Sequence, residues 1–344
     1  MKSLSLSTLA ELAGAEIISG NGERVASGVG IDSRTIRPGE LFVAIRGAKQ
    51  DGHEHIKEAA EKGAIAALVE KLGSGKIPTG FTYLRVADTQ KALQKLAHGY
   101  RRLLAVRVAS VTGSSGKSST KEMLAAVLET TGPTHRTPGN LNNHFGVPLT
   151  LLGIGAEDRW AVVELAMNSP GEIGALAELA EPEVGVVTNI GWAHIEGMGS
   201  KEATAKEKGA LYRALPANGL AVSNADDPME KITLEGCRAR VVRVGSSAGA
   251  DYRLGDLSCE GGSTRFVCEG PRGKMAVRIP VPGAHMAMNA AQAWAAGVEL
   301  GVEPQVAATA LEKIRLPAGR VKLEKLGEGW LLDDSYNANP DSLL

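Results

Sequence analysis

The sequence predicts an α/β protein, with a small N-terminal α/β domain and a central domain of the phosphate-loop type on a mostly parallel sheet covered by helices. Two observations predict this class. Apolar runs of strand length, such as "VRVASVTG", "WAVVEL" and "VGVVTNI", alternate with stretches of helical periodicity. Short buried strands separated by helices are typical of βαβ units. A glycine-rich turn also joins one of these strands to a helix, as in phosphate-binding folds.

The order of the predicted elements divides the chain into three parts. In residues 1–87, "LFVAIRG" is a predicted strand, and "HIKEAAEKGAIAALVE" is typical of a helix, a glycine break and a strand. A helix over "TQKALQKLAHGYRRLL" leads into a central domain at residues 88–317. From residue 318 a strand pair within "GRVKLEKLGEGWLLDDSYNANP" forms a hinge and begins a further domain, residues 318–344.

The hydrophobic pattern of the central domain changes after "NADD". Before this point, helices are predicted over "KSSTKEMLAAVLETTG", "IGALAELAEP" and the stretch after Ser200. After it, "STRFVCEGPRGKMAVRIPV" alternates around a glycine-containing turn, which predicts an antiparallel hairpin. Helices follow over residues 284–300 and 304–314. We therefore expect a sheet that is mostly, and not wholly, parallel.

The composition excludes several classes of function. The 344 residues contain 38 Lys and Arg against 39 Asp and Glu, a net charge of -1, which argues against a nucleic-acid partner. The start of the chain lacks the apolar core of a signal peptide, and no run reaches the roughly 18 apolar residues of a membrane span. We expect a cytoplasmic protein without membrane insertion. The three cysteines lack CxxC spacing, which disfavours a zinc site or a disulfide framework.

The stretch "VTGSSGKSST", residues 111–120, has the character of a phosphate-binding loop. It precedes a predicted helix whose apolar residues share one face, namely Met123, Leu124, Val127 and Leu128. Backbone N–H groups at a helix start favour anions, Lys117 can neutralise phosphates, and the Ser118 hydroxyl can ligate Mg²⁺. The standard pattern has Gly where this chain has Val111, so the alternative is a tight turn before a capped helix.

Two further polar residues follow predicted strands. Glu164 ends "AVVEL", and His194 follows "VGVVTNI". The carboxyl ends of parallel strands are where ligands bind in open α/β sheets. A carboxylate and an imidazole at this edge can complete a magnesium shell around ATP. The alternative for His194 is a loop histidine with a structural hydrogen bond.

A lysine lies within an apolar helical stripe. Spacings of three and four residues align Lys208 with Ala205, Tyr212 and Leu215. Burial lowers the pKa of a lysine, so that the neutral amine becomes accessible. Such an amine can react with CO₂ to give a carbamate, which is a carboxylate on a long arm and can ligate a second Mg²⁺. The alternative is a lysine whose head group reaches solvent.

Together these motifs resemble the Mur ligases of peptidoglycan synthesis, and most closely their MurF branch. The resemblance runs from the N-terminal domain to the last residue. "DSRTIRPGELFVAIRGAKQDGHEHI" is similar to the uridine-nucleotide-binding domain of the MurE and MurF branches, which implies substrate contacts at Ser33 and Arg34. "TPGNLNNHFGVPLTLL" resembles the segment that meets the muramoyl-peptide, which implies substrate contacts at Thr137, Asn140 and Asn142.

The resemblance also implies an ATP and Mg²⁺ site. "VTGSSGKSST" matches the family's own phosphate loop, which likewise lacks the first glycine. The resemblance implies catalytic roles for Lys117, Lys208 and His194. Mg²⁺ contacts are implied for Ser118, Glu164, His194 and Lys208, with Lys208 carbamylated. "HMAMNAAQA", "GRVKLEKL" and "DDSYNANPDSL" resemble nucleotide-contacting segments. The implied nucleotide contacts are Gly113, Ser114, Ser115, Gly116, Lys117, Ser118, Ser119, Asn289, Arg320, Asp334 and Tyr336.

Four features depart from the usual family pattern. Ser118 stands where the family usually has Thr, and His144 and Ala210 stand where acidic residues are common. Family members also carry a third, dinucleotide-fold domain after "DDSYNANP", which we expect to be absent from this chain.

The resemblance implies an ATP-dependent ligase that joins D-Ala-D-Ala to UDP-MurNAc-tripeptide through an acyl phosphate and acts as a monomer. Three alternatives stay open. A MurE-type ligase or a folylpolyglutamate synthetase shares part of the pattern, although "GNLNN" argues against both. A nucleotide- and UDP-sugar-binding fragment without catalysis is expected if turnover needs the third domain. A generic phosphate-loop ATPase would hydrolyse ATP without a UDP-sugar.

Overall fold

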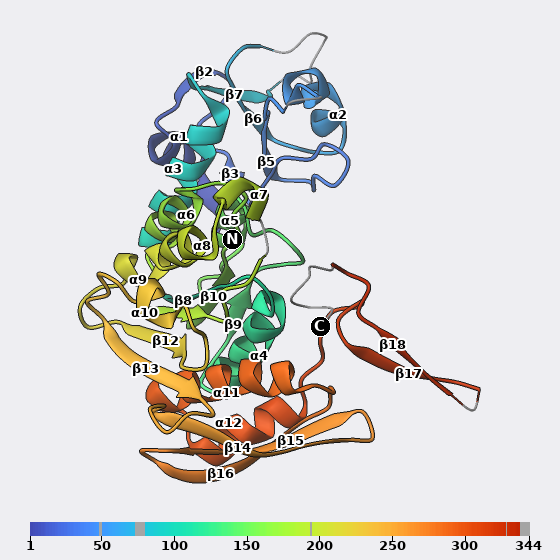
Figure 1. The fold of residues 1–344 in the computed structure, drawn as a ribbon. Coiled ribbons are helices and arrows are strands. Elements are labelled where there is room, and N and C mark those ends of the chain that lie inside the picture. Colours follow the sequence, from blue (N-terminus) through green and yellow to red (C-terminus); the bar gives the residue numbers. More distant parts are fainter. Residues whose placement is uncertain (48–49, 73–79, 193–194, 328, 338–344) are drawn as a thin grey trace. The chain divides into compact units, whose positions relative to one another are not determined.

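The computed structural model describes residues 1–47, 50–72, 80–192, 195–327 and 329–337 (Figure 1). Contacts divide the chain into two compact units. The first comprises Met1–Ala105 with His144–Glu157, and the second comprises Val106–Asn143 with Asp158–Leu344. The domain limits expected at residues 87 and 317 stay predictions.

The first unit is built on a small, mostly parallel sheet. Its elements are β1 (Leu4–Ser5), α1 (Leu6–Ala13), β2 (Glu16–Ser19), β3 (Val25–Ala26), β4 (Gly28–Gly30), β5 (Glu40–Val43), η1 (Gly52–His55), α2 (Ile56–Glu61), β6 (Ala66–Val69), β7 (Thr82–Arg85), α3 (Thr89–Arg102) and α5 (Gly146–Leu152). The strands run in the order β2-β7-β6-β5-β4, where β4 to β7 pair in parallel and β2 pairs antiparallel. The strands and helices predicted in this region are confirmed as β5, α2, β6 and α3.

The second unit is built on a larger sheet. Its elements are β8 (Arg107–Thr112), α4 (Lys117–Glu129), β9 (Thr134–Arg136), β10 (Trp160–Glu164), α6 (Glu172–Ala180), β11 (Val184–Val187), α7 (Ile195–Met198), α8 (Lys201–Lys208), α9 (Ala210–Ala214), β12 (Leu220–Asn224), α10 (Glu230–Thr233), β13 (Arg240–Gly245), β14 (Tyr252–Glu260), β15 (Ser263–Gly270), β16 (Gly273–Ile279), α11 (Ala284–Glu299), α12 (Pro304–Glu312), β17 (Lys322–Leu326) and β18 (Gly329–Asp333).

This larger sheet has the order β16-β15-β14-β13-β12-β11-β8-β10-β9. Strands β8 to β14 pair in parallel, and β14 to β16 pair antiparallel, so the mostly parallel sheet is confirmed. The predicted hairpin is β15 and β16, which turns where Gly270 pairs with Gly273. The predicted strand pair near the end of the chain is β17 and β18.

The strand order reverses direction around β8. The chain passes from β8 through α4 toward β9, and later from β10 through α6 to β11 on the other side of β8. Because parallel crossovers are right-handed, α4 and α6 lie on opposite faces of the sheet. Helix α11 packs on α4, and α9 packs on α6 (Figure 1). A reversal of this kind leaves an opening at the carboxyl ends of the strands, where ligands bind.

The core explains the sequence pattern. Strands β8, β10 and β11 are buried on both faces, and the apolar face predicted for α4 is fully buried, including Met123 and Leu128. In the part of the chain that the structure describes, no helix combines the length and the apolar character needed to cross a bilayer.

Candidate functional site

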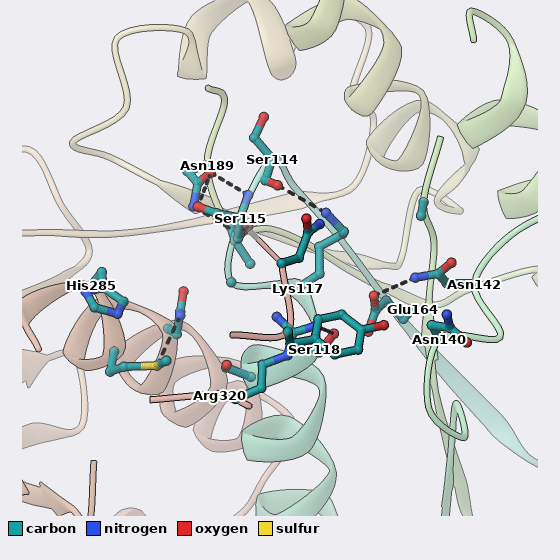
Figure 2. A pocket seen from close by; sticks show the side chains of 18 of the residues that line it. Ser114, Ser115, Lys117, Ser118, Asn140, Asn142, Glu164, Asn189, His285 and Arg320 are labelled. Carbon is teal, nitrogen blue, oxygen red and sulfur yellow. Dashed lines mark hydrogen bonds between the residues drawn. The ribbon is translucent and has the colours of Figure 1, made fainter. Parts of the chain in front are cut away.

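A cavity of about 720 Å³ lies in the second unit, where β8 and β10 end and α4 begins. Much of the predicted site meets there (Figure 2). The predicted residues that line it are Ser114, Ser115, Gly116, Lys117, Ser118, Ser119, Asn140, Asn142, Glu164, Asn289, Arg320, Asp334 and Tyr336. Lining residues that the sequence analysis missed are Asn143, Ala166, Met167, Asn168, Thr188, Asn189, Asn224, His285, Met286, Met288 and Asn337.

The predicted phosphate loop is a tight strand-to-helix connection. Strand β8 ends at Thr112, and α4 begins at Lys117. Gly113 has φ +151°, and a Cβ atom there would lie 1.8 Å from Thr188 Oγ1. Gly116 has φ +78°, and a Cβ atom there would lie 2.7 Å from Asn289 Oδ1. Both positions therefore require glycine, and the backbone comes close to the neighbouring loop and to α11. Gly113 itself does not line the cavity.

Residues that follow β11 hold this loop in place. Asn189 Oδ1 accepts hydrogen bonds from Ser115 N at 3.0 Å and Ser115 Oγ at 3.1 Å, and Asn189 Nδ2 donates to Ser115 O at 3.1 Å (Figure 2). Ser114 Oγ accepts from Gly191 N at 2.8 Å. The loop is thus held by the Asn189 side chain and the Gly191 backbone N–H, which lie some seventy residues later in the sequence. The two polar residues that follow the strand "VGVV", Thr188 and Asn189, were the available signal for this contact.

Lys117 lies folded over the loop. Its Nζ donates to Gly113 O at 2.8 Å and to Ser114 O at 3.2 Å. Burial lowers the pKa of Lys117, while the Glu164 carboxylate acts to raise it and the Arg320 guanidinium acts to lower it. Two carbonyl oxygens are weak partners for a half-buried ammonium, and an anion in the cavity is a stronger one.

Glu164 offers a carboxylate oxygen to the cavity. It is the last residue of β10 and is 2% exposed. Its Oε1 accepts from Asn142 Nδ2 at 2.8 Å (Figure 2), whereas Oε2 has no hydrogen-bond partner among the described residues. A buried carboxylate oxygen without a donor is costly, and a cation in the cavity relieves that cost.

The donor set fits Mg²⁺ that is bound together with phosphates. Ser118 lines the same cavity as Glu164, and its Oγ accepts from Arg320 Nη2 at 3.0 Å. Within the described ranges, no group of three or more His, Cys, Asp or Glu is arranged to hold a metal ion. One carboxylate and one hydroxyl leave most of the coordination to phosphate oxygens and water, as Mg²⁺ prefers. His194 lies outside the described residues.

Lys208 is buried, as its place in the apolar helical stripe predicted. Ala205, Lys208, Tyr212 and Leu215 each have 0% exposure, although Gly209 divides the single helix expected there into α8 and α9. Lys208 does not line the cavity, and its Nζ has no hydrogen-bond partner in the described part of the chain. Burial is the main cause that lowers the pKa of Lys208 well below its usual value, and Lys117 lowers it further. A lowered pKa makes the neutral form of the amine more accessible.

The residues around β17 and β18 line the remaining part of the cavity. The Arg320 guanidinium lies 4.1 Å from the centre of the Tyr336 ring, and Asp334 Oδ1 accepts from Val321 N at 3.2 Å. Asn289, at the cavity end of α11, is 4% exposed. Burial lowers the pKa of His285, and Asp334 acts to raise it.

Three predicted substrate contacts lie elsewhere. Thr137 does not line the cavity, and its Oγ1 accepts from Glu164 N at 2.9 Å. In the first unit, Ser33 Oγ donates to Glu58 Oε2 at 2.7 Å. Arg34 pairs with Asp32, Nη2 to Oδ2 2.7 Å, and this pairing is the main cause that lowers the pKa of Asp32 to about 2.

A phosphate loop at the point where an open parallel sheet reverses its strand order, facing a carboxylate on the adjacent strand, defines a nucleotide-binding enzyme domain of the phosphate-loop class. The chain belongs to the Mur ligase family. The model of the Mur ligase middle domain matches residues 111–297. The model described as the Mur ligase family catalytic domain matches residues 25–101.

Relatives and solved structures that match nearly all of this chain agree with this family. The chain is 38% identical to the UDP-N-acetylmuramoyl-tripeptide--D-alanyl-D-alanine ligase of Escherichia coli strain K12, over all of this chain and 75% of that protein. It is 36% identical to the ligase of the same name from Bacillus subtilis strain 168, over 93% of this chain and 69% of that protein.

Crystal structures of MurF show the same fold. A structure of MurF from Acinetobacter baumannii matches with a TM-score of 0.92 and 30% identity, over 100% of this chain and 75% of that one. MurF from Thermotoga maritima in complex with ADP matches with a TM-score of 0.79 and 30% identity, over 92% of this chain and 72% of that one. A folylpolyglutamate synthetase of L. casei matches at 17% identity with a TM-score of 0.60, which shows a shared fold alone.

Proposed function

We propose that this chain is the ATP-dependent ligase that joins D-Ala-D-Ala to UDP-MurNAc-tripeptide in peptidoglycan synthesis. The observation that carries the proposal is the match, over the entire chain and at 38% identity, to a ligase of that name. The cavity supports it, because the phosphate loop, Glu164, Asn140 and Asn142 line one space. A ligase of this kind must bring ATP and a second anion together, and such a space allows both to bind side by side.

In the proposed reaction the cavity residues act on the phosphates of ATP. Lys117 leaves its two carbonyl partners and binds the β- and γ-phosphates, while the N–H groups at the start of α4 bind phosphate oxygens. Ser118 and Glu164 would hold Mg²⁺, which when bound neutralises charge on the transferred phosphoryl group.

The substrate carboxylate supplies the nucleophile. A carboxylate oxygen of the tripeptide attacks the γ-phosphorus, the bond from that phosphorus to the β-bridging oxygen breaks, and ADP leaves. The amine of D-Ala-D-Ala then attacks the carbonyl carbon of the acyl phosphate and loses a proton, and inorganic phosphate leaves with the attacking carboxylate oxygen. Asn140 and Asn142, which line the cavity beside Glu164, are suited to donate to the substrate.

We also propose that Lys208 becomes carbamylated and, with His194, holds a second Mg²⁺. The burial of the Lys208 amine, its lack of a partner among the described residues and its lowered pKa support this proposal. A neutral amine attacks CO₂ to form a carbamate and releases a proton.

We assign the remaining predicted contacts to ligand recognition. Ser33 and Arg34 serve the UDP-sugar and peptide, and Asn289, Arg320, Asp334 and Tyr336 serve the adenosine part of ATP. Arg34 is 80% exposed beside Asp32, so that a ligand anion can replace the carboxylate. A monomeric state and a cytoplasmic location remain predictions.

Phosphate release from ATP tests the proposal. With ATP, Mg²⁺, UDP-MurNAc-tripeptide and D-Ala-D-Ala all present, we expect steady phosphate release and one new amide product. Omission of the tripeptide should abolish release. In the absence of D-Ala-D-Ala, hydroxylamine should capture the acyl phosphate as a hydroxamate. Phosphate release that is independent of the tripeptide indicates a generic ATPase, and tripeptide binding without release indicates a non-catalytic binding protein.

A further inference from the structure

A second lysine of the phosphate-loop helix is buried and lies outside the predicted site. Lys121 follows Lys117 by four residues on α4 and is 1% exposed. A buried ammonium is costly unless its charge is paired and its N–H groups are bonded. Glu122 pairs with it, Nζ to Oε1 2.8 Å, and Thr137 O accepts from Nζ at 2.8 Å. An apolar side chain of similar size would fill this space without the charge, so the bond to Thr137 is the feature that requires an explanation.

Thr137 connects this lysine to the carboxylate of the cavity. Thr137 is itself 1% exposed and follows β9 directly. Its N–H donates to Val162 O at 3.0 Å, and its Oγ1 accepts from Glu164 N at 2.9 Å. The loop that begins after Thr137 carries Asn142, whose Nδ2 donates to Glu164 Oε1 at 2.8 Å. Thr137 therefore fixes both the backbone of Glu164 and the start of the loop that contacts its side chain.

We propose that Lys121 is a positioning residue for Glu164. By holding Thr137 O, it keeps the Thr137 hydroxyl against Glu164 N and directs the carboxylate toward Ser118. Lys121 and Ser118 lie on one helix, so the bond ties the position of the carboxylate to the phosphate loop as well as to the sheet. The inference rests on the proposed function in one respect, namely that Mg²⁺ with a nucleotide is the ligand that Glu164 and Ser118 share.

The same contacts change the role expected for Thr137. Its hydroxyl oxygen accepts from a backbone N–H, and its carbonyl oxygen accepts from Lys121. We therefore assign Thr137 to the support of Glu164. Partners of this kind tune the ligands that they hold, and their loss typically weakens metal binding.

The test measures how strongly Mg²⁺ tightens ADP binding, by calorimetry on the full chain with and without the metal. Lys121→Met keeps the volume of the side chain and removes the donor. Arg136→Met is the matched control, because Arg136 pairs with the same Glu122, Nη1 to Oε2 3.2 Å. We expect Lys121→Met to bind ADP with wild-type affinity in the absence of metal. The factor by which Mg²⁺ increases that affinity should be about tenfold smaller than in the wild type. Arg136→Met should keep both.

A second pair of variants tests the next bond if Lys121→Met does not fold. Thr137→Val removes the hydroxyl with little change of volume, and Thr137→Ser keeps it. We expect the valine variant to lose the tightening by Mg²⁺ and the serine variant to retain it. In a Glu164→Gln background, Lys121→Met should cause no further loss, because residues that act through one group are not additive.

The outcomes separate this inference from the proposed function. Tightening by Mg²⁺ equal to wild type in Lys121→Met, or in Thr137→Val where the first variant does not fold, overturns the inference. So does a wild-type chain whose affinity for ADP does not respond to Mg²⁺. ADP binding requires no tripeptide, so a chain that shows the expected Mg²⁺ response and yields no ligase product contradicts the proposed function alone.

Discussion

The predicted functional residues of the two units differ in how their polar groups are satisfied. In the second unit, among the residues that the structure describes, Glu164 Oε2 and Lys208 Nζ are buried without partners. In the first unit, Ser33 bonds Glu58, and Arg34 pairs with Asp32 at the surface. A buried polar group without a partner destabilises the fold, and a bound ligand that pairs with it removes this free-energy penalty. A group that already has a partner can only exchange one partner for another. We therefore propose that the chemistry takes place in the second unit and that the first unit contributes recognition.

The largest expected effect is that of Lys117→Ala. It removes the cation that neutralises the transferred phosphoryl group, and we expect kcat to fall by about a thousandfold. Phosphate release with all three substrates measures it. Lys206→Ala, an exposed change on α8, is the control and should have wild-type activity. A wild-type rate in Lys117→Ala would contradict the proposal that the chemistry takes place in the second unit.

Glu164→Gln keeps an acceptor for Asn142 and removes the negative charge. We expect kcat to fall about a hundredfold, because a neutral amide oxygen is a weaker ligand for Mg²⁺. Metal-free ADP binding, measured by calorimetry, should be unchanged. Glu183→Gln, which alters an exposed carboxylate paired with Arg107, is the control. Equal losses of kcat in the two variants would mean that the loss comes from the change in the overall charge of the protein, not from the Mg²⁺ site.

Lys208→Met should lower activity and raise stability. The variant removes a buried amine that has no hydrogen-bond partner among the described residues, so we expect the free energy of unfolding to rise by about 1–3 kcal/mol in CO₂-free buffer. The activity of Lys208→Met should fall. Lys208→Ala should also lose activity, and short carboxylic acids in solution should partly restore the activity of the alanine variant. A less stable Lys208→Met would show that the amine has a stabilising partner.

The lowered pKa of Lys208 also sets a dependence on pH. Between this lowered pKa and the ordinary pKa of lysine, the unfolded chain binds more protons than the folded chain. The free energy of unfolding of the CO₂-free wild type therefore rises with pH across that window. Denaturant titrations at several pH values should show a smaller rise for Lys208→Met. Identical slopes would contradict the lowered pKa.

The smallest expected effect is that of Arg34→Gln in the first unit. We expect the KM for UDP-MurNAc-tripeptide to rise by up to about tenfold, as for one lost charge-assisted hydrogen bond, with kcat unchanged. Lys57→Gln, which changes an exposed lysine paired with Glu61, is the control. A fall in kcat without a change in KM would place Arg34 in the chemistry and remove the distinction between the units.

The sequence predicts the parallel part of the sheet well because β8, β10 and β11 are buried on both faces and therefore appear as apolar runs. Strand β14 escaped prediction, since most of its residues are exposed and it lacks the alternation of a half-buried strand. The break between α8 and α9 at Gly209 was missed, although the buried stripe that spans it was predicted correctly.

The part of the cavity that a sequence motif forms could be predicted from the sequence. The contacts between residues that are distant in sequence could not. The phosphate loop follows from its glycines and lysine. Asn189 lies 74 residues after the Ser115 it holds, and Lys121 lies 16 residues before the Thr137 it holds. No local pattern shows such pairs, because they form only when the sheet brings separate strands together.

The most direct test of the account is the transfer of oxygen from substrate to phosphate. UDP-MurNAc-tripeptide labelled with ¹⁸O in its terminal carboxylate is incubated with the chain, ATP, Mg²⁺ and D-Ala-D-Ala, and the released phosphate is analysed by mass spectrometry. Attack by the carboxylate on the γ-phosphorus predicts one ¹⁸O atom in each phosphate released. Unlabelled phosphate would mean that water attacks ATP, and would contradict the assignment of this cavity to acyl phosphate formation.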